Sequence, residues 1–132
     1  MKITADTNVL VRILTGDDER QSRIAQNTLA RSDMVAVTIP ALCELVWVLA
    51  RGYKIDVAET AAAIRGLINS ANVVVSRPAA EAGLVQLEAG GDFADGVIAF
   101  EGSQLGAEIF VSFDKKAVRL LAKSGEAARL LG

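Results

Sequence analysis

Short apolar runs alternate with longer segments of helical periodicity along the whole chain, and this alternation is the strongest constraint on its fold. Four apolar runs have the length and composition of buried strands, at residues 2–5, 34–37, 72–76 and 108–113. Continuously apolar strands separated by helices are typical of a parallel sheet with both faces covered. The sequence therefore predicts an α/β fold, a three-layer α/β/α domain around a central parallel sheet of four to five strands.

Helical segments fill the intervals between these strands. In the second of them we expect Ile24, Thr28 and Leu29 to face inward. Residues 125–132 fit either a short edge strand or a frayed helix. The spacing predicts helices over residues 9–14, 19–31, 40–51, 56–70, 78–88 and 92–105, and a last one that begins near Asp114 or Lys115.

The chain length suits one domain over residues 1–132, because single cores commonly run to about 100–150 residues. Hydrophobic residues make up 52% of the chain. No apolar run reaches the roughly 20 residues that a membrane-spanning helix needs, and Glu44 interrupts the longest candidate, residues 41–50. We therefore expect a cytoplasmic protein without a membrane segment.

The chain has no histidine and one cysteine, Cys43. These counts exclude Ser-His-Asp and Cys-His catalysis, histidine bases, imidazole-bound zinc and thiolate-rich metal sites. The net charge of −2 gives no overall basic field for nucleic acid. Carboxylates, hydroxyls, lysines and oxygen-bound metals remain as the available chemistry.

Four aspartates occupy positions where this architecture would gather polar groups. Asp6 ends the first strand, Asp114 follows the strand at 108–113, and Asp92 and Asp95 stand three apart at a helix start. Ligands of open parallel sheets bind beyond the carboxyl ends of the strands. The structural alternatives are that Asp6 and Asp114 close strand-to-helix turns and that Asp92 caps a helix.

Glu44 lies among apolar residues in the third predicted helix, so we expect it to be buried. A buried carboxylate costs several kcal/mol unless it is paired or binds a metal. Its alternative interpretation is a buried ion pair with an arginine such as Arg12 or Arg51.

The acids are more informative together than separately. Two carboxylates about 4 Å apart repel by roughly 4 kcal/mol at an effective dielectric near 20. Without histidine, a hard divalent cation bound by oxygen, Mg²⁺ or Mn²⁺, is the simplest way to offset that repulsion. Such a cation activates water and orients a phosphodiester, which is the chemistry of phosphoryl hydrolysis.

Four segments resemble a known family, in family order and at family-like intervals. They are Ala5–Arg12 (ADTNVLVR), Leu42–Leu49 (LCELVWVL), Gly91–Ala99 (GDFADGVIA) and Val111–Ala117 (VSFDKKA). The chain resembles the PIN-domain ribonucleases, specifically the VapC-type toxins of bacterial and archaeal toxin–antitoxin pairs. The resemblance implies a PIN fold and Mg²⁺- or Mn²⁺-dependent endoribonuclease activity, with in-line attack by a metal-activated water.

The resemblance also implies roles for particular residues. It makes Asp6, Glu44, Asp95 and Asp114 the catalytic, metal-holding quartet. Asp92 becomes an auxiliary ligand or a helix cap. The residues Thr7, Asn8 and Ser112 would hydrogen-bond the carboxylates or the substrate phosphate.

The same resemblance implies partners: an RNA substrate, a cognate antitoxin and a second copy of the chain in a homodimer. Arg12, Lys115 and Arg119 are our candidates for contacts with RNA phosphates, because they lie near Asp6 and Asp114 in the sequence. A solvated face is the alternative for neighbouring basic residues such as Lys116. For Trp47 we expect core packing of at least part of the ring, although an apolar surface there also suits either protein partner.

Two other enzyme or signalling classes fit poorly. A haloacid-dehalogenase-like phosphatase needs Asp-x-Asp, and the third position here is Asn8. A receiver domain would need its acidic pair, phosphoacceptor and lysine at other strand ends. The open alternative is a non-catalytic PIN-like scaffold that binds RNA or protein, although such a scaffold has no evident reason to retain four mutually repelling acids.

Overall fold

The computed structural model describes residues 1–132 as two compact units, Met1–Ser76 and Arg77–Gly132. We call them the N-terminal unit and the C-terminal unit and describe each by itself. Organisation of the chain as a single domain stays a prediction.

Three short parallel strands form the sheet of the N-terminal unit. They are β1 (Lys2–Thr4), β2 (Met34–Ala36) and β3 (Val73–Val74), in the order β1-β2-β3. Val35 fixes the register, because it pairs with Ile3 on one side and Val73 on the other. Val35 is fully buried, as the apolar run had indicated.

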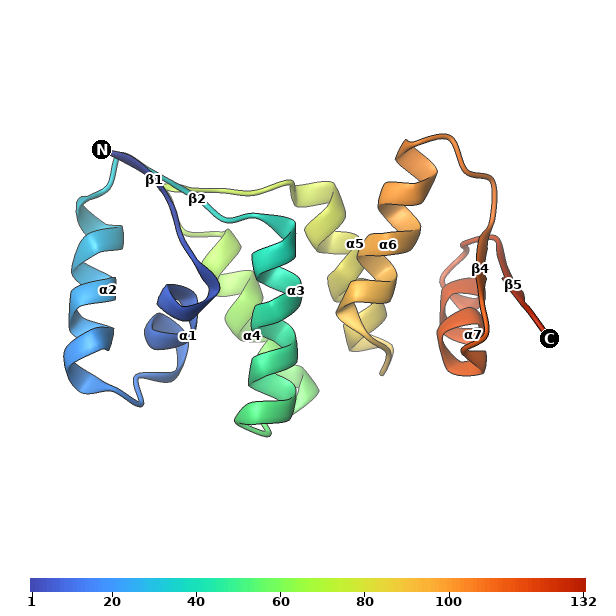
Figure 1. Cartoon of the computed structure of the whole chain (residues 1–132), viewed down its shortest axis with the longest axis horizontal. Coiled ribbons are helices and arrows are strands. Elements are labelled where there is room, and N and C mark those ends of the chain that lie inside the picture. The colour runs from blue at the N-terminus through green and yellow to red at the C-terminus, as the bar shows by residue number, and fades with distance from the viewer. The chain divides into compact units, whose positions relative to one another are not determined.

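The helices of this unit, coloured blue to green in Figure 1, supply most of its core. Side-chain caps fix their starts: Asp18, Thr38 and Asp56 each accept a hydrogen bond from a backbone N–H two or three residues inside the helix. The elements are α1 (Thr7–Thr15), α2 (Glu19–Arg31), α3 (Ile39–Trp47), the π-helical turn η1 (Val48–Gly52) and α4 (Val57–Ile68). The fully buried side chains of these elements include Leu10, Leu42, Leu45, Leu49 and Ile64.

The predicted inward face of α2 is wrong for Ile24 and Thr28, whereas Leu29 is half-buried. Ile24 is 51% exposed and Thr28 is also exposed, whereas Ser22 and Ala25 are buried. The small side chains at these two positions face the neighbouring helix α1, with which α2 is in contact. The small residues of α2 are therefore buried, while Ile24 and Thr28 line an open groove between α1 and α2.

The C-terminal unit consists of three helices and two strands. They are α5 (Arg77–Glu88), α6 (Phe93–Gln104), β4 (Phe110–Ser112), α7 (Lys115–Lys123) and β5 (Ala128–Leu130). Strands β4 and β5 are parallel, with Phe110 opposite Ala128. In Figure 1, α5 and α6 lie side by side, and α7 lies against β4 and β5.

Two glycines allow α5 and α6 to pack closely. A Cβ atom on Gly83 would lie 2.6 Å from the Phe93 ring, and one on Gly96 would lie 2.4 Å from the Ala82 carbonyl oxygen. Between these helices, Gln86 is fully buried, and neither polar atom of its carboxamide has a hydrogen-bond partner. The contact is therefore tight and contains one unsatisfied amide.

The α/β class with helices around a parallel sheet is confirmed, but the expected single sheet of four to five strands is wrong. The central sheet has three strands, and the fourth and fifth form a separate two-stranded sheet. Apolar runs predict strands and their parallel direction, whereas they do not encode which strand lies beside which. The ambiguous segment at 125–132 contains a strand, β5.

None of the helices combines the length and the apolar character that a membrane span requires.

Candidate functional site

Three of the predicted site acids are the N-cap residues of helices. The Asp6 carboxylate accepts a hydrogen bond from the Thr7 N–H at 2.8 Å, Asp92 from the Ala94 N–H at 3.3 Å, and Asp114 from the Ala117 N–H at 3.0 Å. Each of these caps uses the Oδ1 atom. The positive end of a helix favours a charged carboxylate at its start. The capping alternative given for Asp92 describes its side chain correctly, and Asp6 and Asp114, expected at strand-to-helix turns, cap helices there as well. Each of the three retains a second oxygen for other chemistry.

Glu44 is exposed, which contradicts the expectation that it is buried. On α3 the buried positions are Ile39, Ala41, Leu42, Leu45 and Val46. Glu44 and Trp47, three residues apart on this helix, are both exposed, Trp47 to 61%. An apolar sequence context therefore did not imply burial around the whole helix, and Trp47 packs with only part of its side chain, within what the sequence had indicated.

Thr7 connects Glu44 to the helix that follows Asp6. The Thr7 hydroxyl donates a hydrogen bond to the Glu44 Oε1 atom at 3.3 Å, and Thr7 itself is only 8% exposed. The suggested buried ion pair of Glu44 with Arg12 or Arg51 is wrong, because Glu44 is exposed and forms an ion pair with neither. The Arg12 guanidinium pairs instead with Asp17 at 3.1 Å. Two predicted site acids of the N-terminal unit are thus linked through one threonine that immediately follows Asp6.

Three acids of the C-terminal unit influence one another electrostatically. Partial burial raises the pKa of Asp95, and the negative charges of Asp92 and then of Asp114 raise it further. Desolvation and like charges both disfavour the ionised form of a carboxyl group. The charges of Asp92 and Asp114 therefore act on Asp95, and the assignment of these three acids to one functional site stays a prediction.

The remaining polar candidates are distributed over both units. Ser112 accepts a hydrogen bond at its Oγ from the Asp114 N–H at 3.0 Å, so it orders the backbone of an acid. Asn8 is exposed on α1 and lines a groove between α1 and α2. Lys115 and Arg119 are exposed on α7.

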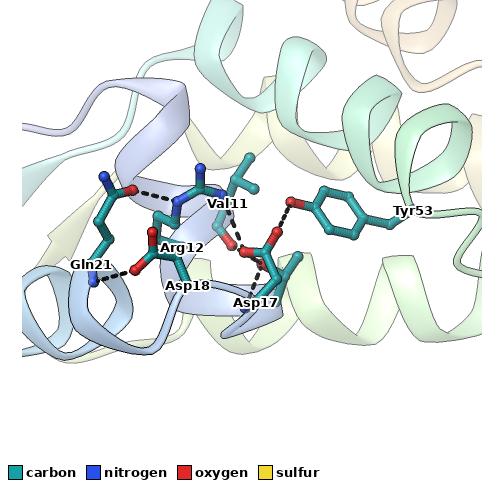
Figure 2. A network of polar contacts seen from close by, with 7 residues as sticks. Val11, Arg12, Asp17, Asp18, Gln21 and Tyr53 are labelled. Carbon is teal, nitrogen blue, oxygen red and sulfur yellow. Dashed lines mark hydrogen bonds and ion pairs between the residues drawn. The ribbon is translucent and has the colours of Figure 1, made fainter.

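Arg12 belongs to a network of polar contacts that sequence reasoning missed. Its Nε donates to the Gln21 side chain at 2.6 Å, and its Nη1 donates to Asp17 (Figure 2). Asp17 also accepts hydrogen bonds from the hydroxyls of Thr15 and Tyr53. Asp17 and Tyr53 are 36 residues apart, and no local pattern connects them.

The donor set fits a hard cation in its chemistry. Every predicted ligand is a carboxylate, and carboxylate oxygens are what Mg²⁺ and Mn²⁺ bind in proteins. Burial and then the negative charges of Asp92 and Asp114 raise the pKa of Asp95, and a bound cation would offset the repulsion between these charges. Within either unit, no group of three or more acidic or cysteine side chains is close enough to hold a metal ion.

Comparison with protein families identifies the fold. The PIN domain family model matches residues 3–123, so the chain belongs to the PIN-domain family. PIN domains are commonly nucleases and typically use divalent metals, so the chain has a nuclease fold. No curated protein matches the chain.

Proposed function

We propose that this protein is a Mg²⁺- or Mn²⁺-dependent endoribonuclease of the VapC type, the toxin of a toxin–antitoxin pair. The observation that carries the proposal is the match of residues 3–123 to the PIN domain family. Acidic side chains of the C-terminal unit support it, because burial and then the negative charges of Asp92 and Asp114 raise the pKa of Asp95. In a chain of the PIN family, such acids suit a cation and a phosphodiester.

The proposed ligands are the quartet Asp6, Glu44, Asp95 and Asp114, with Asp92 as an auxiliary ligand. When bound, the cation would offset their charge, lower the pKa of a coordinated water and polarise the phosphate. The chain itself contributes orientation: Thr7 holds Glu44, Ser112 holds the Asp114 backbone, and the helix starts hold the aspartates. Preorganised ligands need no rearrangement when the reaction begins.

The supporting contacts to RNA are proposed for the exposed cations Lys115 and Arg119 on α7, with Arg12 and Asn8 on α1. Phosphate contacts of this kind position a nucleic acid without reading its sequence. A cognate antitoxin, a homodimer and a cytoplasmic setting complete the proposal, and they rest on the resemblance to VapC-type toxins.

The test is cleavage of a mixed cellular RNA pool by antitoxin-free protein, with Mg²⁺, Mn²⁺ or a chelator. Glu44→Gln and Asp95→Asn proteins purified in the same way control for contaminating nucleases. We expect discrete products that require the cation and that disappear with either variant. Full activity in both variants with unchanged metal dependence would contradict the quartet, and no cleavage by folded protein that binds metal would favour the non-catalytic scaffold.

A further inference from the structure

Helices α1 and α3 are in contact, and side-chain hydrogen bonds join their chain segments at two places. Near the start of α1, the Thr7 hydroxyl donates to Glu44 on α3. Ten residues further along, Asp17 accepts from the hydroxyl of Tyr53, which lies nine residues beyond Glu44. The two segments therefore run in the same direction. One hydrogen bond joins them at Glu44, and a second one, between Tyr53 and Asp17, joins them about three helical turns away.

Further hydrogen bonds fix both partners of the Tyr53–Asp17 contact. On the Asp17 side, the carboxylate is fixed by the Thr15 hydroxyl at 2.9 Å and by Arg12, whose Nε is bound in turn to Gln21 on α2 (Figure 2). On the other side, the N–H of Tyr53 donates to the Val48 carbonyl and closes the π-helical turn η1.

Electrostatics agree with this geometry. The hydrogen bonds from Tyr53 and then from Thr15 lower the pKa of Asp17, with a smaller contribution from the charge of Arg12. Asp17 is therefore ionised at neutral pH and is a constant acceptor for the tyrosine hydroxyl.

The Tyr53–Asp17 hydrogen bond can affect the position of Glu44 through the helices that connect them. Helices are stiff over a few turns, so a shift of η1 relative to the end of α1 moves α3 along α1. The Thr7–Glu44 bond is already 3.3 Å long and tolerates little further separation before it is lost.

From these contacts we propose that Tyr53 is a positioning residue for Glu44: its hydroxyl, through Asp17, sets how α3 lies along α1 and so keeps Glu44 within reach of Thr7. The functional part of this role rests on the proposed function, in which Glu44 is a metal ligand. Nothing in the role requires Tyr53 to touch metal or RNA.

The test replaces Tyr53 by phenylalanine, which keeps the ring and removes only the hydroxyl. Ser70→Ala is the matched control, because the Ser70 hydroxyl, two residues beyond the end of α4, donates at 3.1 Å to the carbonyl of Gly66 in that helix and joins no second helix. The first readout needs neither metal nor RNA: the NMR signals of the Thr7 methyl group and the Glu44 side-chain carboxyl carbon. We expect both signals to shift in Tyr53→Phe and to stay in place in Ser70→Ala, and unchanged signals in Tyr53→Phe would overturn the proposal.

The second readout is the affinity for Mn²⁺ alone, measured by titration calorimetry. We expect Tyr53→Phe to weaken binding about tenfold, the range seen when an outer partner of a ligand is lost, and to add little in a Thr7→Val background. Unchanged affinity in Tyr53→Phe, or a full further loss in the Thr7→Val background, would overturn the positioning role. A wild-type protein that binds no Mn²⁺ would instead overturn the proposed function, and the NMR signals would then decide alone on Tyr53.

Discussion

Gly96 offers a sharp test of the α5–α6 contact, because its replacement by alanine should destabilise the protein although alanine is the better helix former. A Cβ at this position would lie 2.4 Å from the Ala82 carbonyl oxygen and 2.8 Å from the Gln86 Cβ, whereas ordinary contact begins near 3.4 Å. The obstacle is backbone, so the two helices would have to separate by about 1 Å, the difference between 2.4 and 3.4 Å. A gap of that size forfeits about a quarter to a half of each dispersion contact that it opens.

The magnitude follows from two opposing effects. Overpacking costs roughly 1–3 kcal/mol, and we take the upper half of that range because no side chain can rotate away. Alanine returns about 1 kcal/mol of helix propensity. The net loss is about 1–2 kcal/mol, which for a chain of this size lowers Tm by roughly 4–8 °C.

Gly102 provides the matched control in the same helix. A Cβ there meets no atom within 4 Å, and its backbone is helical, so Gly102→Ala should stabilise the protein by about 0.5–1 kcal/mol. Thermal unfolding followed by far-UV circular dichroism, supported by urea titration, measures both variants. A Gly96→Ala protein as stable as the wild type, or a Gly102→Ala protein less stable, would refute the packing argument.

Four further predictions concern the C-terminal unit, its acids and the proposed metal site. Gln86→Met should raise the free energy of unfolding by about 1–3 kcal/mol, because it removes a buried carboxamide without partners at nearly constant volume; urea unfolding measures this, and an unchanged midpoint would show that the amide is satisfied. Asp114→Asn should lower the pKa of Asp95 in a carbon-detected NMR titration, because a neighbouring negative charge is removed; a pKa that stays in place would contradict their proximity. Since the folded-state pKa of Asp95 is raised, its contribution to stability is complete below the unfolded-state pKa and is lost as pH rises through the folded-state pKa, and Asp95→Asn should abolish that part of the pH dependence. Mn²⁺ at about 100 times its Kd should add about 2.7 kcal/mol to the stability and a chelator should reverse it, whereas an unchanged Tm over a wide range of Mn²⁺ concentrations would argue against a metal site.

Most of the elements were predictable from sequence because their signals are local. Apolar runs marked the strands around Val35 and Val111, and Gly16 and Gly52 marked the ends of helices. The acids at helix starts followed from the same local chemistry, since an aspartate before a helix caps it.

The errors arose where the outcome depends on a partner distant in the sequence. The face of α2 is decided by α1, so Ser22 and Ala25 are buried in place of Ile24. The exposure of Glu44 depends on how α3 is rotated against its neighbours. The bond between Asp17 and Tyr53 joins residues too far apart for any periodicity to connect them.

Because three of the proposed site aspartates also cap helices, their presence in a sequence does not by itself indicate activity. Asp6, Asp92 and Asp114 each begin a helix, and loss of such a cap costs about 1 kcal/mol whether or not the protein cleaves anything. A descendant that had lost its activity would therefore still be under pressure to keep aspartate, or its near equivalent asparagine, at these positions. Glu44 caps no helix and is exposed, so its retention would reflect chemistry more than folding. If Glu44 is a metal ligand as proposed, glutamate at this position would distinguish an active enzyme from an inactive relative better than the capping aspartates would.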